Sequence, residues 1–145
     1  MALWEQRGWR DLPRIEVDEL GKPFFPDYPD THFSLSHTAG AAAAVLADTP
    51  VGVDIERVRP VSVRAMERIA GVRTEAAFFR SWVRREARVK RTGSGIVTMM
   101  RTEAPLNRGE FYYEVDAFHG YAAGVAAGQP EPPQPVHRLM LDQLL

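Results

Sequence analysis

The chain has 145 residues, enough for one domain with a modest core. Its 18 Lys and Arg against 19 Asp and Glu leave a net charge of −1, which favours neither a nucleic acid nor an anionic membrane as partner. The absence of cysteine excludes disulfides, thiolate metal sites and cysteine nucleophiles. No apolar run approaches the ~20 residues of a membrane span, and residues 1–10 lack a signal peptide's apolar core, so we expect a cytoplasmic protein.

The first predicted strands follow a segment rich in turn residues. Residues 21–29 contain three prolines, and residues 32–37, HFSLSH, alternate as a short strand does. Residues 39–47 are ambiguous. Their alanines favour a helix, whereas the short length and the turn residues at 48–50 favour a hairpin.

Residues 51–56 predict a strand whose two faces differ. Alternation places Val51, Val53 and Ile55 on one face, and Gly52, Asp54 and Glu56 on the other. Two carboxylates about 7 Å apart along a strand repel each other unless a cation lies between them. Mg²⁺ takes such oxygen ligands. Spacing alone favours the alternative, a solvated face on which Arg57 or Arg59 pairs with the carboxylates.

Two helices are predicted next. Ser62 is a suitable N-cap for the first, and Gly71 marks its end. Thr74 is a suitable N-cap for the second, which covers residues 75–91 and stops at Gly93.

The C-terminal third predicts a strand pair and a tail. Residues 110–118 and 121–127 are expected to pair through a turn near His119-Gly120. The fold class is therefore α+β, with antiparallel strands packed against two main helices. The proline-rich residues 128–135 predict an extended linker, and residues 136–145 an apolar tail that docks on its own domain or on a partner.

The second helix places a carboxylate beside an aromatic residue. Trp82, Glu86 and Lys90 are spaced i, i+4 and i+8 and form one column. Glu86 then lies at the edge of the apolar face, where it needs a partner or its pKa rises. Metal ligation would supply a partner. A pair with Lys90, worth about 0.3–0.5 kcal/mol, fits the sequence equally well.

The same helix is strongly basic. Six basic residues stand against Glu86 alone, giving +5: Arg80, Arg84, Arg85, Arg88, Lys90 and Arg91. A solvated face is the usual explanation for such a run. The more specific interpretation is a docking surface for an acidic protein or a phosphate.

A third group combines Lys22, Ser36 and His37, whose side chains all suit phosphate oxygens. A Ser-His hydrolase is disfavoured, because neighbouring residues of a strand point to opposite faces and no G-x-S-x-G motif is present.

Three motifs, taken in order, resemble the 4′-phosphopantetheinyl transferases of the surfactin-synthetase-activating type. They are Gly21-Lys22-Pro23 with Phe33-Ser34-Leu35-Ser36-His37, then Val51-Gly52-Val53-Asp54-Ile55-Glu56, then Trp82-Val83-Arg84-Arg85-Glu86-Ala87-Arg88-Val89-Lys90. The family form of the last motif is W-x-x-K-E-A-x-x-K, so Arg85 replaces a lysine. The match covers roughly residues 12–127.

The resemblance implies a reaction and its residues. It implies the 4′-phosphopantetheinyl transferase fold and transfer of phosphopantetheine from coenzyme A to a serine of an acyl or peptidyl carrier protein. Asp54, Glu56 and Glu86 would hold Mg²⁺. Glu86 or a metal-bound water would act as base, and Lys90 would stabilise the diphosphate and the departing 3′,5′-ADP.

The resemblance also implies partners. Lys22, Ser36 and His37 would bind coenzyme A on its adenosine and phosphate side. The basic face of the second helix would suit an acidic carrier protein.

The chain departs from the family in length. Members usually hold two similar halves, so we expect a single domain over residues 1–127, in which 1–50 are a remnant of the first half and 51–127 the catalytic half. Self-association as a dimer or trimer is expected to complete the site. The alternative function is a non-catalytic relative that binds coenzyme A or a carrier protein.

Overall fold

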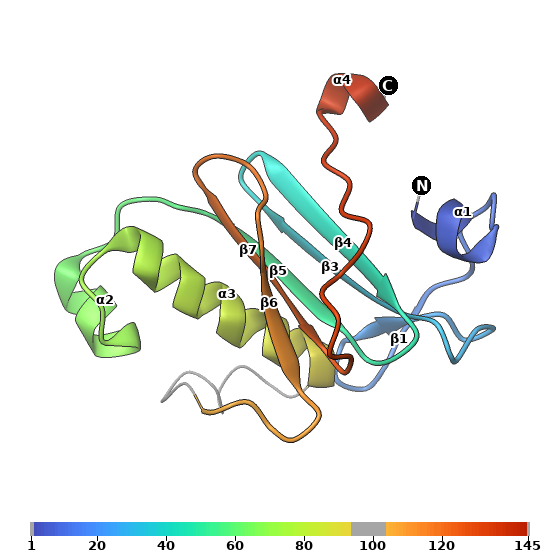
Figure 1. Ribbon diagram of the computed structural model, residues 1–145, viewed down its shortest axis with the longest axis horizontal. Helices are drawn as coiled ribbons and strands as arrows, with labels where there is room; N and C mark the ends of the chain where they lie inside the picture. The colour runs from blue at the N-terminus through green and yellow to red at the C-terminus, as the bar shows by residue number, and fades with distance from the viewer. Residues whose placement is uncertain (1, 94–103, 145) are drawn as a thin grey trace.

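The computed structural model describes residues 2–93 and 104–144 (Figure 1). In chain order, the elements in these ranges are α1 (Ala2–Arg7), β1 (Glu16–Val17), β2 (Pro23–Phe24), β3 (His32–Thr38), β4 (Ala41–Ala47), β5 (Gly52–Arg57), α2 (Val63–Ala70), α3 (Glu75–Thr92), β6 (Phe111–Val115), β7 (Tyr121–Ala127) and α4 (Leu141–Leu144). Among these residues, no helix combines the length and apolar character that a membrane span requires.

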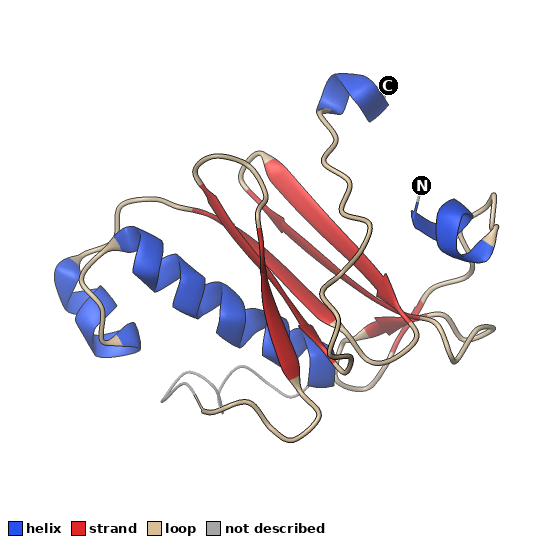
Figure 2. Cartoon of the chain, in the orientation of Figure 1, coloured by secondary structure: helices blue, strands red, loops and turns tan. Residues whose placement is uncertain are grey.

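A three-stranded antiparallel sheet with the order β5-β7-β6 forms the centre of the molecule. The long helix α3 packs against β5 and β7 (Figures 1 and 2). The predicted alternation in β5 is confirmed. Val51 and Val53 pack in a core cluster with Val125 and Ala127, and Gly52 on the other side meets α3. The mixed α+β class is confirmed as well.

The helix boundaries agree with the capping residues. Ser62 Oγ accepts a hydrogen bond from the Ala65 amide, and Thr74 Oγ1 accepts one from the Ala77 amide. Gly71 and Gly93 end the two helices with positive φ angles of 65° and 71°. Met66, Phe78 and Phe79 then join α2 to α3 in a second core cluster.

The ambiguous alanine segment is a strand. It forms the β3–β4 antiparallel hairpin, in which Leu35 pairs with Ala44 and Ser36 pairs with Ala43. Ala43 and Val45 pack against the core of the central sheet, whereas Ala44 is exposed. Burial of alternate side chains outweighs the helix preference of alanine, which is a weak tendency that tertiary packing overrides.

The predicted strand over residues 110–118 is too long. β6 ends at Val115, and residues 116–120 form the connection, in which the Tyr121 amide donates to Phe118 O (3.1 Å). Glu110 does not join the strand. It is buried against Arg88 of α3, and its amide donates to Asn107 O (3.0 Å) in the turn before the strand.

Residues 128–135 contain neither helix nor strand, as expected of a linker. The tail contacts its own domain, because Arg138 Nε donates to Asp116 O (2.6 Å) and His137 Nε2 lies 2.8 Å from Glu5 Oε2. Met140 and Leu141 nevertheless remain exposed.

Replacing Gly52 by alanine is expected to destabilise the protein. A Cβ at this position would overlap Ala87 O and Arg91 N, which are backbone atoms of α3, so the helix would have to move away from β5. We expect the free energy of unfolding in urea to fall by about 1–3 kcal/mol or more. Ala44→Val, on the exposed face of β4, is the control. Equal stability of Gly52→Ala and the parent protein would contradict the close contact.

Candidate functional site

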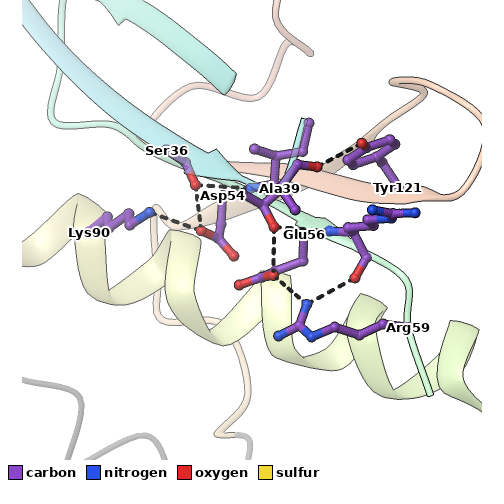
Figure 3. Close-up of polar contacts among 10 residues, drawn as sticks. Ser36, Ala39, Asp54, Glu56, Arg59, Lys90 and Tyr121 are labelled. Carbon is purple, nitrogen blue, oxygen red and sulfur yellow. Dashed lines mark hydrogen bonds and ion pairs between the residues drawn. The ribbon is translucent and has the colours of Figure 1, made fainter. Parts of the chain in front are cut away.

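Asp54 is the buried centre of the candidate site, with 4% of its surface exposed. Its Oδ1 accepts a hydrogen bond from Ser36 Oγ (2.8 Å) and one from Lys90 Nζ (2.9 Å) (Figure 3). Its Oδ2 is buried and has no hydrogen-bond partner among the described residues. Burial raises the pKa of Asp54, and the hydrogen bond and charge of Lys90 oppose this shift.

Glu56 lies two residues further along the same face of β5. Its Oε2 accepts a hydrogen bond from Thr38 Oγ1 (3.3 Å) and an ion-paired one from Arg59 Nη1 (2.9 Å) (Figure 3). The same guanidinium nitrogen donates to Arg57 O (2.9 Å). The Arg59 contact named in the sequence alternative is therefore present, but the face is not solvated, because Asp54 is buried.

Glu86 faces these two carboxylates from α3. Burial raises the pKa of Glu86, and the negative charges of Asp54 and Glu56 raise it further, while Lys90 opposes the shift. The helix thus brings the third predicted carboxylate into electrostatic range of the other two. Among the described residues, no three or more Asp, Glu or His side chains lie close enough together to hold a metal ion as they stand.

Three hydroxyl groups of β3, those of Ser34, Ser36 and Thr38, contact β5 beside the site, and sequence analysis singled out only Ser36. The amides of Val53, Ile55 and Arg57 donate to Ser34 Oγ (3.1 Å), Ser36 Oγ (3.2 Å) and Thr38 Oγ1 (3.3 Å), respectively. β3 and β5 belong to separate sheets, and these hydroxyls connect them in a parallel register. Ser34 and Thr38 were missed, although a hydroxyl at every second position of a predicted strand is visible in the sequence.

Two of the predicted coenzyme A-binding residues, Lys22 and His37, do not direct their side chains toward Asp54. His37 is exposed and follows Ser36 on the strand, so alternation turns it away from Asp54. Lys22 Nζ donates to three main-chain carbonyls, Arg91 O (2.5 Å), Lys90 O (2.7 Å) and Val51 O (3.3 Å). Burial lowers the pKa of Lys22, and the charge of Arg91 adds to this effect.

Lys22→Met is expected to lower the free energy of unfolding by about 1–3 kcal/mol, because carbonyl groups at the end of α3 lose their donor. Urea denaturation measures this change, and Arg73→Met, at an exposed ion pair, is the control. Unchanged stability together with a raised KM for coenzyme A would favour the predicted binding role of Lys22 instead.

The basic run of α3 is not a solvated face. Arg85 is buried and donates to Ile69 O (2.9 Å), and Arg91 Nε donates to Pro50 O (3.1 Å). Arg88 is 1% exposed and pairs with Glu110 Oε1 (2.7 Å). Arg84 lies over the ring of Tyr112. These arginines hold neighbouring segments in place, whereas Arg80 is exposed, and docking of an acidic partner on the basic residues of this helix stays a prediction.

The chain is similar to named proteins over much of its length. No protein-family model matches it. It is 27% identical over 161 aligned residues to the 4′-phosphopantetheinyl transferase Sfp of Bacillus subtilis (strain 168), covering 91% of this chain and 70% of that protein. It is 36% identical to the 4′-phosphopantetheinyl transferase psf-1 of Bacillus pumilus, over 57% of this chain and 40% of that one.

A third relative comes from Salmonella typhi. The 4′-phosphopantetheinyl transferase AcpT of Salmonella typhi is 32% identical over 115 residues, which cover 69% of this chain and 60% of AcpT. All three relatives carry the same enzyme name. The order and type of the three sequence motifs agree with that name, and so does the carboxylate-lined contact between β5 and α3. The chain is therefore similar, over up to 91% of its length, to 4′-phosphopantetheinyl transferases of the type that includes Sfp.

Proposed function

We propose that this chain transfers the 4′-phosphopantetheine moiety of coenzyme A to a serine of an acyl or peptidyl carrier protein, releasing 3′,5′-ADP. Similarity to proteins named 4′-phosphopantetheinyl transferase supports the reaction class. The main support from this chain's own residues is Asp54. Its buried Oδ2 has no hydrogen-bond partner among the described residues, and the carboxylates of Glu56 and Glu86 are nearby.

A divalent cation fits this arrangement. When ionised, Asp54, Glu56 and Glu86 bring three negative charges, and Lys90 and Arg59 bring two positive ones, so negative charge remains in excess. Mg²⁺ accepts one or two protein carboxylates together with phosphate oxygens. We assign Asp54, Glu56 and Glu86 as the residues that would hold it. Bound there, the ion would polarise the diphosphate of coenzyme A and offset the charge that develops during transfer.

The side chains of α3 supply the remaining steps. Glu86 takes the proton of the carrier serine, whose oxygen bonds to the β-phosphorus as the bond to the bridging oxygen of the α-phosphate breaks. Lys90 Nζ, which donates to Asp54 Oδ1 here, would donate to the departing phosphate of 3′,5′-ADP.

Binding of coenzyme A through Lys22, Ser36 and His37 stays a prediction. His37 is exposed and available to a ligand, whereas Lys22 must exchange its carbonyl partners to reach a phosphate. Self-association as a dimer or trimer also stays a prediction, which light scattering tests directly.

The mass of an apo carrier protein after incubation with this chain, coenzyme A and Mg²⁺ tests the proposal. We expect the carrier to gain the phosphopantetheine mass and to lose that gain when a chelator removes the metal. Several carriers, from fatty acid, polyketide and peptide synthases, should be compared. Carrier binding without any mass gain over long incubation would instead support a non-catalytic binding relative.

A further inference from the structure

We propose that Ser36 and Thr38 are positioning residues that orient Asp54 and Glu56 toward the metal. This inference rests on the proposed function. It gives Ser36 a role inside the protein instead of the predicted contact with coenzyme A, and it gives Thr38 a role that sequence analysis did not assign.

The same arrangement occurs twice, two residues apart. Ser36 Oγ accepts from the Ile55 amide (3.2 Å) and donates to Asp54 Oδ1 (2.8 Å), which Lys90 also contacts. Thr38 Oγ1 accepts from the Arg57 amide (3.3 Å) and donates to Glu56 Oε2 (3.3 Å). That carboxylate oxygen is also the one that Arg59 contacts. Each carboxylate is thus held at one oxygen by a hydroxyl and a cation.

The main-chain amide explains why each hydroxyl points at its carboxylate. A hydroxyl has one hydrogen to donate and two lone pairs to accept with. When an amide of β5 occupies a lone pair, the hydroxyl hydrogen is turned toward the neighbouring carboxylate oxygen. Ser36 is 6% exposed, so water does not compete for this bond. The result is a carboxylate whose Oδ1 is occupied and whose buried Oδ2 has no partner among the described residues.

The orienting role proposed for Ser36 differs from merely connecting β3 to β5. Ser34 makes only the connection and so serves as the comparison. Ser34 lies on the same strand, is 5% exposed, and accepts from the Val53 amide at 3.1 Å. By the same register, the residue of β5 that corresponds to Asp54 is here Gly52, which has no side chain to orient. Ser34 and Ser36 therefore share the connecting role, and Ser36 alone of the two contacts a predicted metal ligand.

The test uses the full chain and two matched pairs of variants. Ser36→Ala removes an orienting hydroxyl, and Ser34→Ala removes a hydroxyl that only connects the strands. Thr38→Val removes the hydroxyl at nearly constant shape, and Thr38→Ser keeps it. Thermal melting establishes that each variant folds. Because Thr38 is half-buried, its pair still tests the inference if the buried Ser36→Ala variant does not fold.

The readout is binding of Mn²⁺, a paramagnetic substitute for Mg²⁺, followed by electron paramagnetic resonance in the presence of coenzyme A. We expect Ser36→Ala and Thr38→Val to weaken Mn²⁺ binding by about tenfold or more, as loss of a residue that orients a metal ligand does. The metal concentration for half-maximal transfer should rise in parallel, while the KM for coenzyme A, measured at saturating metal, is unchanged. Ser34→Ala and Thr38→Ser should bind Mn²⁺ as the parent chain does.

Two results would overturn the inference while leaving the proposed function intact. One is an equal loss of Mn²⁺ affinity in Ser34→Ala and Ser36→Ala. The other is a raised KM for coenzyme A in Ser36→Ala with unchanged Mn²⁺ affinity, which would return this serine to the coenzyme A site. A parent chain that neither binds Mn²⁺ nor modifies any carrier would overturn both proposals together.

Discussion

Asp54→Asn should abolish measurable transfer of phosphopantetheine while leaving the fold intact. Asparagine keeps the shape of the side chain but removes the charge that a divalent cation requires at this buried position. A metal ion supplies several kcal/mol of transition-state stabilisation, and a loss of about 4 kcal/mol corresponds to about a thousandfold in rate. The mass gain of an apo carrier per unit time measures the effect, and Glu86→Gln should behave alike.

Stability separates this effect from simple unfolding. Burial raises the pKa of Asp54, which means that the charged carboxylate is disfavoured in the metal-free protein. Asp54→Asn should therefore melt within a few degrees of the parent chain. Glu114→Gln is a matched control. Glu114 of β6 and Asp54 of β5 both pair with Gly124 of β7, but Glu114 is exposed. Normal turnover in both Asp54→Asn and Glu86→Gln would refute the residue assignment.

Glu110→Gln should destabilise the protein by about 3–5 kcal/mol, because it leaves the buried charge of Arg88 without its counter-ion. The side chains of Arg88 and Glu110 are 1% and 2% exposed. Arg88 also donates to Ala104 O (2.5 Å) and Pro105 O (2.9 Å), so this arginine holds the chain where it approaches β6. Urea denaturation measures the loss.

The ion pair also predicts a dependence on pH. Burial by itself would raise the pKa of Glu110, but hydrogen bonds from Arg88 and the Asn107 amide outweigh it and hold the pKa below its usual value. The stabilisation from Glu110 is therefore present above the pKa of the unfolded chain, about 4.3, and is lost as the pH falls through the lower folded value. Glu110→Gln should remove this part of the acid dependence.

The exposed pair between Arg73 and Glu67 is the control for the buried one. Glu67→Gln should change the free energy of unfolding by no more than about 1 kcal/mol, as is usual for surface ion pairs. If Glu110→Gln and Glu67→Gln cost the same, the buried pair does not anchor α3 to the segment before β6.

Local rules were enough to predict much of the fold. The alternation of residues 51–56 identified a strand with an apolar face and a carboxylate face, because successive side chains of a strand point in opposite directions. Ser62, Gly71, Thr74 and Gly93 identified the helix ends, because capping depends on hydrogen bonds between residues that are close in sequence. Local rules did not single out the carboxylates Asp54, Glu56 and Glu86 as a site, because their spacing alone favoured a solvated face; the resemblance of the three motifs to a known family did.

Tertiary structure alone decided what these side chains contact. Arginines that look like a charged surface in sequence are buried in α3, because carbonyls and a carboxylate from distant segments meet them there. The alanine strand β4 is extended because the central sheet offers its alternate side chains a core. Lys22 and Ser36 were recognised as important residues, but their bonds run to α3 and Asp54 across separations that no local pattern encodes. Period and capping are properties of neighbouring residues, whereas burial and hydrogen-bond partners depend on which distant segments the fold brings together.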